Sequence, residues 1–299
     1  MTNTTSSLPQ FSPVIVGTMR FGSWGAQMDR PTLEKLVDAC VDLGLYDFDL
    51  ADIYGDYTEE AHLGEVLKGR KDLVQRLRLT TKCGIKMLAD NRPSHRIKSY
   101  DSTGKHILQS VDQSLQDLGV EQIEILLLHR PDYLMDPHEV SEVFTRLQEA
   151  GKVKFFGVSN FSTSQFSLLN SLFPLVTNQV ELSLLQAQAL DDGTLDQCFQ
   201  LGIQPTVWSP FGGGALFGET DDPRLQKIKS TAESIGERHQ ATIDQVLLAW
   251  IFKHPSRIVP IVGSTKISRI ASALKATEIQ LTHEEWYELL EAAKGHEVA

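Results

Sequence analysis

The sequence predicts a parallel (β/α)₈ barrel, and three observations support this fold. Short apolar runs alternate with helical segments along the whole chain, which is the order of a parallel sheet with right-handed crossovers. The 299 residues suffice for such a barrel, which typically has about 250 residues. The glycine fingerprint of a doubly wound fold does not follow the first apolar run, so the closed barrel is preferred to that alternative.

Eight strands are expected where apolar runs end in a loop or at the start of a helix. They are residues 13–17, 45–49, 77–82, 123–128, 155–159, 177–181, 204–208 and 258–261. The run 123–128 is almost continuously apolar, as expected when helices and core cover both faces of a strand.

The expected helices follow from apolar spacing and from capping residues. They are residues 31–44, 59–68, about 107–118, the segment between Asp136 and Gly151, 163–170, 194–201, 223–239, 242–253, 267–276 and an extra C-terminal helix at 282–293. Asp136 followed by Pro137 is a typical helix start. No linker or shift in composition separates the units, so residues 1–299 are expected to form one barrel domain, with residues 1–8 disordered.

The bulk properties exclude several classes of partner. The formal net charge of −11 argues against nucleic acid and anionic membranes, which require a basic face. Three cysteines without metal-ligand spacing indicate reduced thiols in the cytoplasm. The polar N-terminus is not a secretory signal, and no apolar run approaches the roughly 20 residues that span a bilayer. We expect a soluble cytoplasmic protein without a metal site, and we favour a monomer.

Residues of chemical interest stand where the expected strands end. They are Asp49, Lys82, His129, Asn160, Gln179, Ser209 and Ser264. Because a parallel barrel gathers the carboxyl ends of its strands at one rim, where barrel enzymes have their active sites, these residues are expected to form one site.

Four residues at or near these strand ends suit carbonyl reduction. A tyrosine hydroxyl with a pKa of about 10, such as that of Tyr54, is a poor proton donor at neutral pH. A lysine cation nearby, Lys82, is expected to lower that pKa by roughly 1–3 units. Asp49 would keep the lysine charged, and His129 would orient the substrate oxygen.

Each of these residues also has an ordinary structural explanation, such as a strand-end cap, loop packing, a solvated cation or a core histidine. Their joint occurrence on three successive strand ends favours a site. A barrel aldolase, in which Lys82 forms a Schiff base, stays open as an alternative. A metal-dependent hydrolase is disfavoured, because no histidine or aspartate cluster has ligand spacing.

The motifs around these residues resemble the aldo-keto reductases. The segments are Asp49-x₄-Tyr54, Lys82 in Thr-Lys-Cys-Gly, His129 in Leu-Leu-Leu-His-Arg-Pro-Asp, Gly157 to Phe161, Thr177 to Glu181, Trp208-Ser209-Pro210 and Pro260 to Ser264. Gly212-Gly213-Gly214 and the turn 263–266 are most similar to the YdhF-like bacterial branch. The similarity covers essentially the whole chain.

This resemblance implies an enzyme that reduces aldehydes or ketones with a nicotinamide cofactor. Tyr54 would be the general acid, Lys82 would tune it, Asp49 would orient Lys82, and His129 would position the carbonyl. Some relatives of this fold are regulatory subunits that sense the cofactor, so an NADPH-binding protein with little turnover is a second alternative.

The resemblance also implies a set of cofactor-binding residues. They are Gly17, Thr18, Met19, Asp49, Ser159, Asn160, Gln179, Trp208, Ser209, Pro210, Phe211, Gly212, Gly214, Leu216, Gly263, Ser264, Thr265, Lys266 and Arg269. Asn160 and Gln179 would hold the carboxamide, Trp208 would stack on the nicotinamide, and the glycine-containing loop 209–216 would cover the pyrophosphate.

The last strand end indicates which cofactor is used. Ser264, Thr265, Lys266 and Arg269 lie where a helix starts, so backbone N–H groups and two cations could bind a 2′-phosphate. We therefore expect NADPH. Many relatives have a lysine where Gly263 stands, so Lys266 would have to take its place.

The substrate is expected to contact Met19, Trp24, Tyr54 and His129. The loop after His129 is short and few residues follow the last helix, which predicts an open pocket that accepts several carbonyl compounds, with segment 85–103 as one wall.

Three neighbouring charged residues, Asp52, Arg130 and Asp132, are expected to form salt bridges at the rim. Cys83 should point away from the mouth and pack, because successive residues of a strand face opposite sides.

Overall fold

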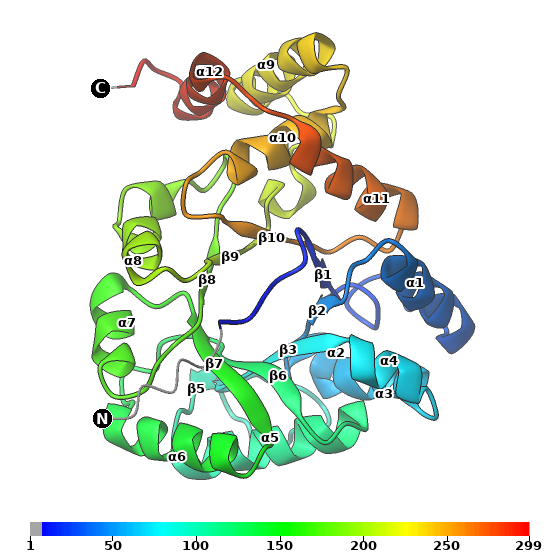
Figure 1. Ribbon diagram of the computed structural model, residues 1–299, viewed down its shortest axis with the longest axis vertical. Helices are drawn as coiled ribbons and strands as arrows, with labels where there is room; N and C mark the ends of the chain where they lie inside the picture. The colour runs from blue at the N-terminus through cyan, green and yellow to red at the C-terminus, as the bar shows by residue number, and fades with distance from the viewer. Residues whose placement is uncertain (1–7, 299) are drawn as a thin grey trace.

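The computed structural model describes residues 8–298 and confirms the barrel (Figure 1). Eight parallel strands close in the order β1-β10-β9-β8-β7-β6-β3-β2. Their bounds are β1 Ile15–Gly17, β2 Asp47–Asp49, β3 Arg78–Cys83, β6 Ile123–Leu128, β7 Val153–Ser159, β8 Asn178–Glu181, β9 Thr206–Trp208 and β10 Val259–Val262. Each expected strand is present. Six of them begin one or two residues later than expected, and β7 begins two residues earlier. The expected disorder of residues 1–8 concerns mainly residues 1–7, which lie outside the described residues.

Helices surround the barrel as the alternating pattern predicted. Their bounds are α1 Arg30–Asp42, α2 Tyr54–Tyr57, α3 Glu59–Leu67, α4 Lys71–Arg76, α5 Gly104–Leu118, α6 Pro137–Glu149, α7 Thr163–Asn170, α8 Thr194–Leu201, α9 Pro223–His239, α10 Ile243–Phe252, α11 Ile267–Lys275 and α12 His283–Lys294. The cap predicted at Asp136 is present, since its side chain accepts a hydrogen bond from the His138 N–H. The extra helix α12 packs against α9 outside the ring (Figure 1).

Several short elements were not predicted, among them α2, which contains Tyr54. Strands β4 (Ile85–Lys86) and β5 (Ser99–Tyr100) form an antiparallel pair within the segment expected to be a loop. We call residues 85–100 the β4–β5 excursion. Helix α4 fills the stretch between α3 and β3. Elements of two to six residues are too short to show a hydrophobic period, which explains why the sequence did not indicate them.

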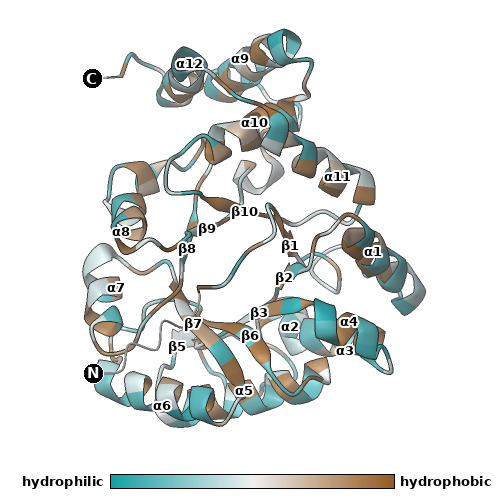
Figure 2. Ribbon diagram, in the orientation of Figure 1, coloured by the Kyte–Doolittle hydropathy of each residue, from teal (hydrophilic) through white to brown (hydrophobic). Residues whose placement is uncertain are grey.

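Alternation along the strands separates two layers of core. On β6, Ile125 and Leu127 face the barrel interior, whereas Leu126 and Leu128 pack with α5 and α6 residues in a second cluster. In Figure 2, β6 and β10 are largely brown, while α5 and α6 alternate between brown and teal. His129 follows Leu128, so the same alternation turns it inward at the carboxyl end of the strands.

The amino end of the barrel is filled. The segment before β1 crosses the ring (Figure 1), and Phe11 packs against both interior clusters of residues. The interior is therefore a packed core, and the carboxyl rim is the face left for a site.

The three cysteines are buried and free, and Cys83 packs in the helix-facing layer as predicted. Burial raises the pKa of Cys40 and Cys198 to about 12. None of the helices between residues 8 and 298 is long and apolar enough to span a membrane.

Candidate active site

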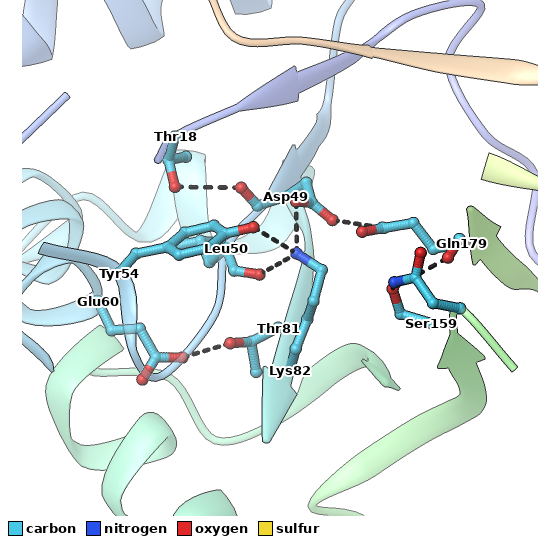
Figure 3. Close-up of polar contacts among 10 residues, drawn as sticks. Thr18, Asp49, Leu50, Tyr54, Glu60, Thr81, Lys82, Ser159 and Gln179 are labelled. Carbon is cyan, nitrogen blue, oxygen red and sulfur yellow. Dashed lines mark hydrogen bonds and ion pairs between the residues drawn. The ribbon is translucent and has the colours of Figure 1, made fainter. Parts of the chain in front are cut away.

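The carboxyl rim brings together the four residues that the sequence predicted. Figure 3 shows three of them, Asp49, Tyr54 and Lys82. Asp49 ends β2, Lys82 lies near the end of β3, and His129 follows β6. Tyr54 begins α2, the turn that follows β2. Since β2 pairs with β3 and β3 pairs with β6, the first three residues come from neighbouring positions of one sheet.

Lys82 is the centre of the site. Its Nζ donates to Asp49 Oδ1 at 2.6 Å, to the Leu50 carbonyl at 2.6 Å and to the Tyr54 hydroxyl at 3.2 Å. Three acceptors match the three N–H bonds of an ammonium group, so its position is fixed. Only 1 % of the residue is exposed.

The charge of Lys82 is retained in spite of this burial. Burial lowers its pKa, but the charges and hydrogen bonds of Asp49 and Tyr54 outweigh that effect, so the pKa is raised overall. Lys82 is therefore an ammonium at neutral pH. A Schiff-base lysine needs the opposite, a pKa lowered enough to give a free amine.

Asp49 is held from several sides. Its Oδ2 accepts a hydrogen bond from Gln179 Nε2 at 2.8 Å, while Oδ1 binds Lys82. The backbone N–H and the hydroxyl of Thr18 both donate to the Asp49 carbonyl, at 3.0 and 3.1 Å. These contacts join the carboxyl ends of β1, β2, β3 and β8 around Asp49, and Figure 3 shows the side-chain ones.

Burial changes the pKa of Tyr54 more than Lys82 does. Burial raises it most, Lys82 lowers it as predicted, Asp49 raises it again, and the net result is a pKa above the ordinary value of 10.0. The prediction considered the lysine and omitted burial, which is the larger effect. Tyr54 is thus fully protonated at neutral pH, and Lys82 becomes most important when the phenol loses its proton.

His129 is a neutral imidazole beside Tyr54. The two rings meet edge to face with centroids 6.0 Å apart. Burial first, then Lys82 and Arg130, hold the pKa of His129 well below its usual value. Neither ring nitrogen forms a hydrogen bond among residues 8–298, and Nδ1 is buried. The N–H group of the neutral ring is therefore available to donate a hydrogen bond to a substrate oxygen.

The turn that carries Tyr54 has an unusual backbone. Gly55, Asp56 and Tyr57 have φ values of 57°, 56° and 66°, so the short element α2 is left-handed. Glycine adopts this conformation readily, but other residues held in it cost about 1–3 kcal/mol each. Such a turn persists only where its surroundings hold it.

A chain of polar groups continues around the rim from Asp49. The Ser159 hydroxyl donates to the Gln179 carbonyl at 2.9 Å, and Asn160 Nδ2 donates to Ser159 Oγ at 2.7 Å. Trp208 Nε1 donates to Asn160 Oδ1 at 3.2 Å. The residues predicted to hold and stack on a nicotinamide therefore lie together on β7, β8 and β9.

The loop after β9 lies at the surface, with two exceptions. Pro210 is buried, and Leu216 belongs to the core, so its side chain does not line the rim. Ser209 and the three glycines 212–214 have positive φ values. Gly17, which was also predicted to bind the cofactor, has a packing reason to be glycine, because a Cβ there would lie 2.9 Å from the Ile261 side chain.

The residues predicted to bind a phosphate lie at the start of α11. Ser264 Oγ accepts from the Lys266 N–H at 3.1 Å, which shapes the turn that follows β10. Lys266 and Arg269 are exposed, and neither forms an ion pair within the part of the chain that the structure describes. Two uncommitted cations and a helix start fit a phosphate group.

The predicted rim salt bridges were wrong. Among residues 8–298, Asp52, Arg130 and Asp132 form no ion pair. Asp132 instead accepts from the N–H groups of Ser102 and Leu134. The Arg130 guanidinium lies 5.5 Å from the centre of the Trp208 ring, and Asp52 Oδ1 is buried without a hydrogen-bond partner. Of the other residues predicted to contact the substrate, Trp24 has its ring centre 6.0 Å from that of Tyr54, and Met19 is exposed.

Glu60, behind Lys82 on α3, is a buried acid that the sequence did not single out. It accepts hydrogen bonds from Thr81 Oγ1 at 2.5 Å and from Ser114 Oγ at 2.9 Å. Burial nevertheless raises its pKa from 4.5 to about 7. Because the folded pKa exceeds the unfolded one, the stability that this shift contributes is full below pH 4.5 and lost as the pH rises through about 7.

We expect Glu60→Gln to remove this pH dependence. Relative to wild type, the variant should gain up to about 3 kcal/mol in its free energy of unfolding when the pH rises from about 5 to about 9. Urea unfolding of both proteins at the two pH values measures the change. If the free energies of unfolding of variant and wild type differed by the same amount at both pH values, the raised pKa of Glu60 would be contradicted.

Comparison with known proteins agrees with this geometry. The model of the Aldo/keto reductase family matches residues 13–294. The chain is 42 % identical to the uncharacterized oxidoreductase YcsN of Bacillus subtilis, over 97 % of this chain and 96 % of that one. It is 41 % identical to the oxidoreductase YdhF of Escherichia coli, again over 97 % and 96 %.

A 6-dehydroglucose reductase of Agrobacterium fabrum is 38 % identical, over 97 % of each chain. Among solved structures, the thermostable aldo-keto reductase Tm1743, crystallised with the inhibitor epalrestat, matches with a TM-score of 0.79 over 97 % of both chains. At 24 % identity this likeness concerns the fold. The chain belongs to the aldo/keto reductase family and is similar to the YdhF-like oxidoreductases within it.

Proposed function

We propose that the protein reduces aldehydes and ketones to alcohols with NADPH, and that Tyr54 is the general acid. The observation that carries the proposal is the buried Lys82 ammonium, which lies 2.6 Å from the Asp49 carboxylate and 3.2 Å from the Tyr54 hydroxyl. Membership of an oxidoreductase family supports the reaction type.

A nicotinamide bound at the rim would supply the hydride to the carbonyl carbon. The carbonyl oxygen then takes the Tyr54 proton, and the Lys82 ammonium stabilises the phenolate that remains. Asp49 holds Lys82 in place, and the neutral His129 donates a hydrogen bond that aims the carbonyl oxygen at Tyr54. Hydride and proton together complete the alcohol.

The polar chain on the rim has capacity left for a carboxamide. The side-chain amide of Gln179 uses one N–H for Asp49, which leaves its oxygen, Oε1, as an acceptor. Asn160 Nδ2 donates once and can donate again. We therefore assign the carboxamide to Asn160 and Gln179, the ring contact to Trp208, and the pyrophosphate to the loop 209–216.

The preference for NADPH is assigned to the start of α11. We expect Lys266→Ala to weaken NADPH binding by roughly 10–100-fold, because a charge-assisted hydrogen bond to the 2′-phosphate is lost. NADH, which lacks this phosphate, should bind almost unchanged. Fluorescence titration with both cofactors measures this, with Lys275→Ala, an exposed cation at the other end of α11, as the matched control. Equal losses for NADPH and NADH would show that Lys266 does not bind the phosphate.

The substrate class can be narrowed to aldehydes that carry hydroxyl groups. Two relatives, 38 % and 36 % identical, are 6-dehydroglucose reductases. On the rim of this chain, the Arg130 guanidinium lies over the Trp208 ring and forms no ion pair in the described part of the chain. Glu181 on β8 lies opposite Trp208 on the neighbouring strand β9. Burial raises the pKa of Glu181 and Arg130 opposes the rise. A donor and an acceptor on one rim suit hydroxyl groups.

An aldehyde panel tests the proposed reaction and its substrate class together. We expect oxidation of NADPH with several aldehydes, and a higher kcat/KM for glyceraldehyde than for propanal. Arg130→Met should reduce that ratio by roughly tenfold, since one hydrogen bond to a charged group contributes about 1.5–3 kcal/mol. Strict selectivity for one compound would contradict the open pocket. NADPH binding without turnover of any carbonyl would favour a regulatory subunit.

A further inference from the structure

We infer that Tyr57 is a positioning residue for Tyr54, and that the β4–β5 excursion holds the left-handed turn on which Tyr54 is mounted. The inference rests on the proposed function, in which Tyr54 is the general acid. Tyr57 has no contact with Lys82, Asp49 or His129 among the hydrogen bonds and ring contacts of residues 8–298.

The turn itself is restrained by local hydrogen bonds that leave Asp56 without one. Inside it, the Tyr57 N–H donates to the Ile53 carbonyl at 3.3 Å and the Thr58 N–H donates to the Tyr54 carbonyl at 3.1 Å. The Thr58 hydroxyl donates to the Gly55 carbonyl at 2.6 Å. Asp56 and Tyr57 are left-handed although neither is glycine. A backbone in this state relaxes unless contacts from elsewhere in the fold determine it.

The β4–β5 excursion provides those contacts. The Tyr57 hydroxyl accepts a hydrogen bond from the Met87 N–H at 2.8 Å and lies 3.5 Å from the Ile85 carbonyl, to which it can donate. Asn91 Nδ2 donates to the Asp56 carbonyl at 2.8 Å. Two successive left-handed residues are therefore each bound to the same excursion.

The ring of Tyr57 is held as well as its hydroxyl. The Arg92 guanidinium lies 4.4 Å from the ring centre, and the His95 ring meets it edge to face at 6.0 Å. His95 is itself fixed, because its Nδ1 lies 2.8 Å from the Met87 carbonyl. All these partners come from residues 85–100, so Tyr57 connects the left-handed turn to the β4–β5 excursion.

Movement of the turn would act directly on proton transfer. Tyr54 is three residues before Tyr57, and its hydroxyl must stay near both Lys82 and the carbonyl oxygen. Small displacements of a catalytic group reduce the rate strongly, by up to about 10²-fold for 1 Å. Loss of the Tyr57 hydroxyl should therefore slow the proton step without removing a group from the site.

Tyr57→Phe tests the inference. We expect kcat to fall by about tenfold, which is less than the 10²–10⁴-fold that a general acid contributes, while KM and the NADPH dissociation constant stay as in wild type. The solvent deuterium isotope effect on kcat should increase, because proton transfer becomes slower. Tyr100→Phe is the matched control, since this tyrosine lies on β5 and its hydroxyl makes no hydrogen bond among residues 8–298. Asn91→Ala should give a smaller effect in the same direction.

The Tyr54→Phe background separates positioning from general structural damage. In that background, Tyr57→Phe should change the residual rate little, because the group it positions is absent. The inference would be overturned if Tyr57→Phe lowered the rate by the same factor in both backgrounds. It would also be overturned if the rate fell only as much as the folded fraction and the isotope effect stayed unchanged. Full turnover of Tyr54→Phe alone would instead overturn the proposed function.

Discussion

Replacing Tyr54 by phenylalanine is expected to lower kcat by about 10²–10⁴-fold while NADPH binding stays nearly unchanged. Only the hydroxyl is lost, and the remaining ring can keep its contacts with Trp24 and His129. Oxidation of NADPH in the presence of an aldehyde gives the rate, and fluorescence titration gives the affinity.

The fold of the variant should be checked by thermal unfolding, because the hydroxyl also accepts a hydrogen bond from Lys82. A variant that retains wild-type turnover would remove Tyr54 from the role of general acid. A variant that loses cofactor binding together with turnover would show that Tyr54 shapes the cofactor site instead.

Replacing Lys82 by methionine is expected to cost stability as well as activity. The change leaves the carboxylate of Asp49, a residue of which only 3 % is exposed, without its cation. Breaking a buried ion pair in this way typically costs about 3–5 kcal/mol. Urea unfolding should show this decrease in the free energy of unfolding, and turnover should be lost.

The double variant Asp49→Asn with Lys82→Met separates the two effects. It removes both charges, so most of the lost stability should return, whereas carbonyl reduction should not. If Lys82→Met alone were as stable as wild type, the ion pair would not be the stabilising contact that its geometry indicates. If the double variant reduced aldehydes, Lys82 would have no part in the reaction.

The barrel could be predicted because its signals are local and repeated. A strand such as β6 is apolar at every position but Glu124, and α6 begins with Pro137 after the cap Asp136, so composition and capping identify both. The β4–β5 pair has two residues in each strand and gives no such signal. The left-handed conformation of Asp56 and Tyr57 also escaped, since contacts with the excursion hold it and the local sequence does not require it.

The site was predictable to the extent that barrel topology fixes it. Asp49, Lys82 and His129 meet because neighbouring parallel strands end at one rim, and strand position alone places them. For Tyr54 the sequence indicated that Lys82 lowers the pKa, but it did not indicate the larger and opposite effect of burial, which depends on how the rest of the chain packs around the ring. The salt bridges expected at Asp52 and Arg130 failed for a similar reason, since spacing in the sequence does not say which side chains face each other.

The most direct test of the proposed reaction follows the hydrogen atoms. Wild-type protein is incubated with an aldehyde and with NADPH deuterated at C4 of the nicotinamide, and the product is analysed by mass spectrometry and NMR. We predict an alcohol with deuterium on its carbinol carbon, one NADPH consumed for each alcohol, and no covalent adduct on Lys82 after borohydride treatment. Bound NADPH without any alcohol, or an adduct on Lys82, would contradict carbonyl reduction by this site.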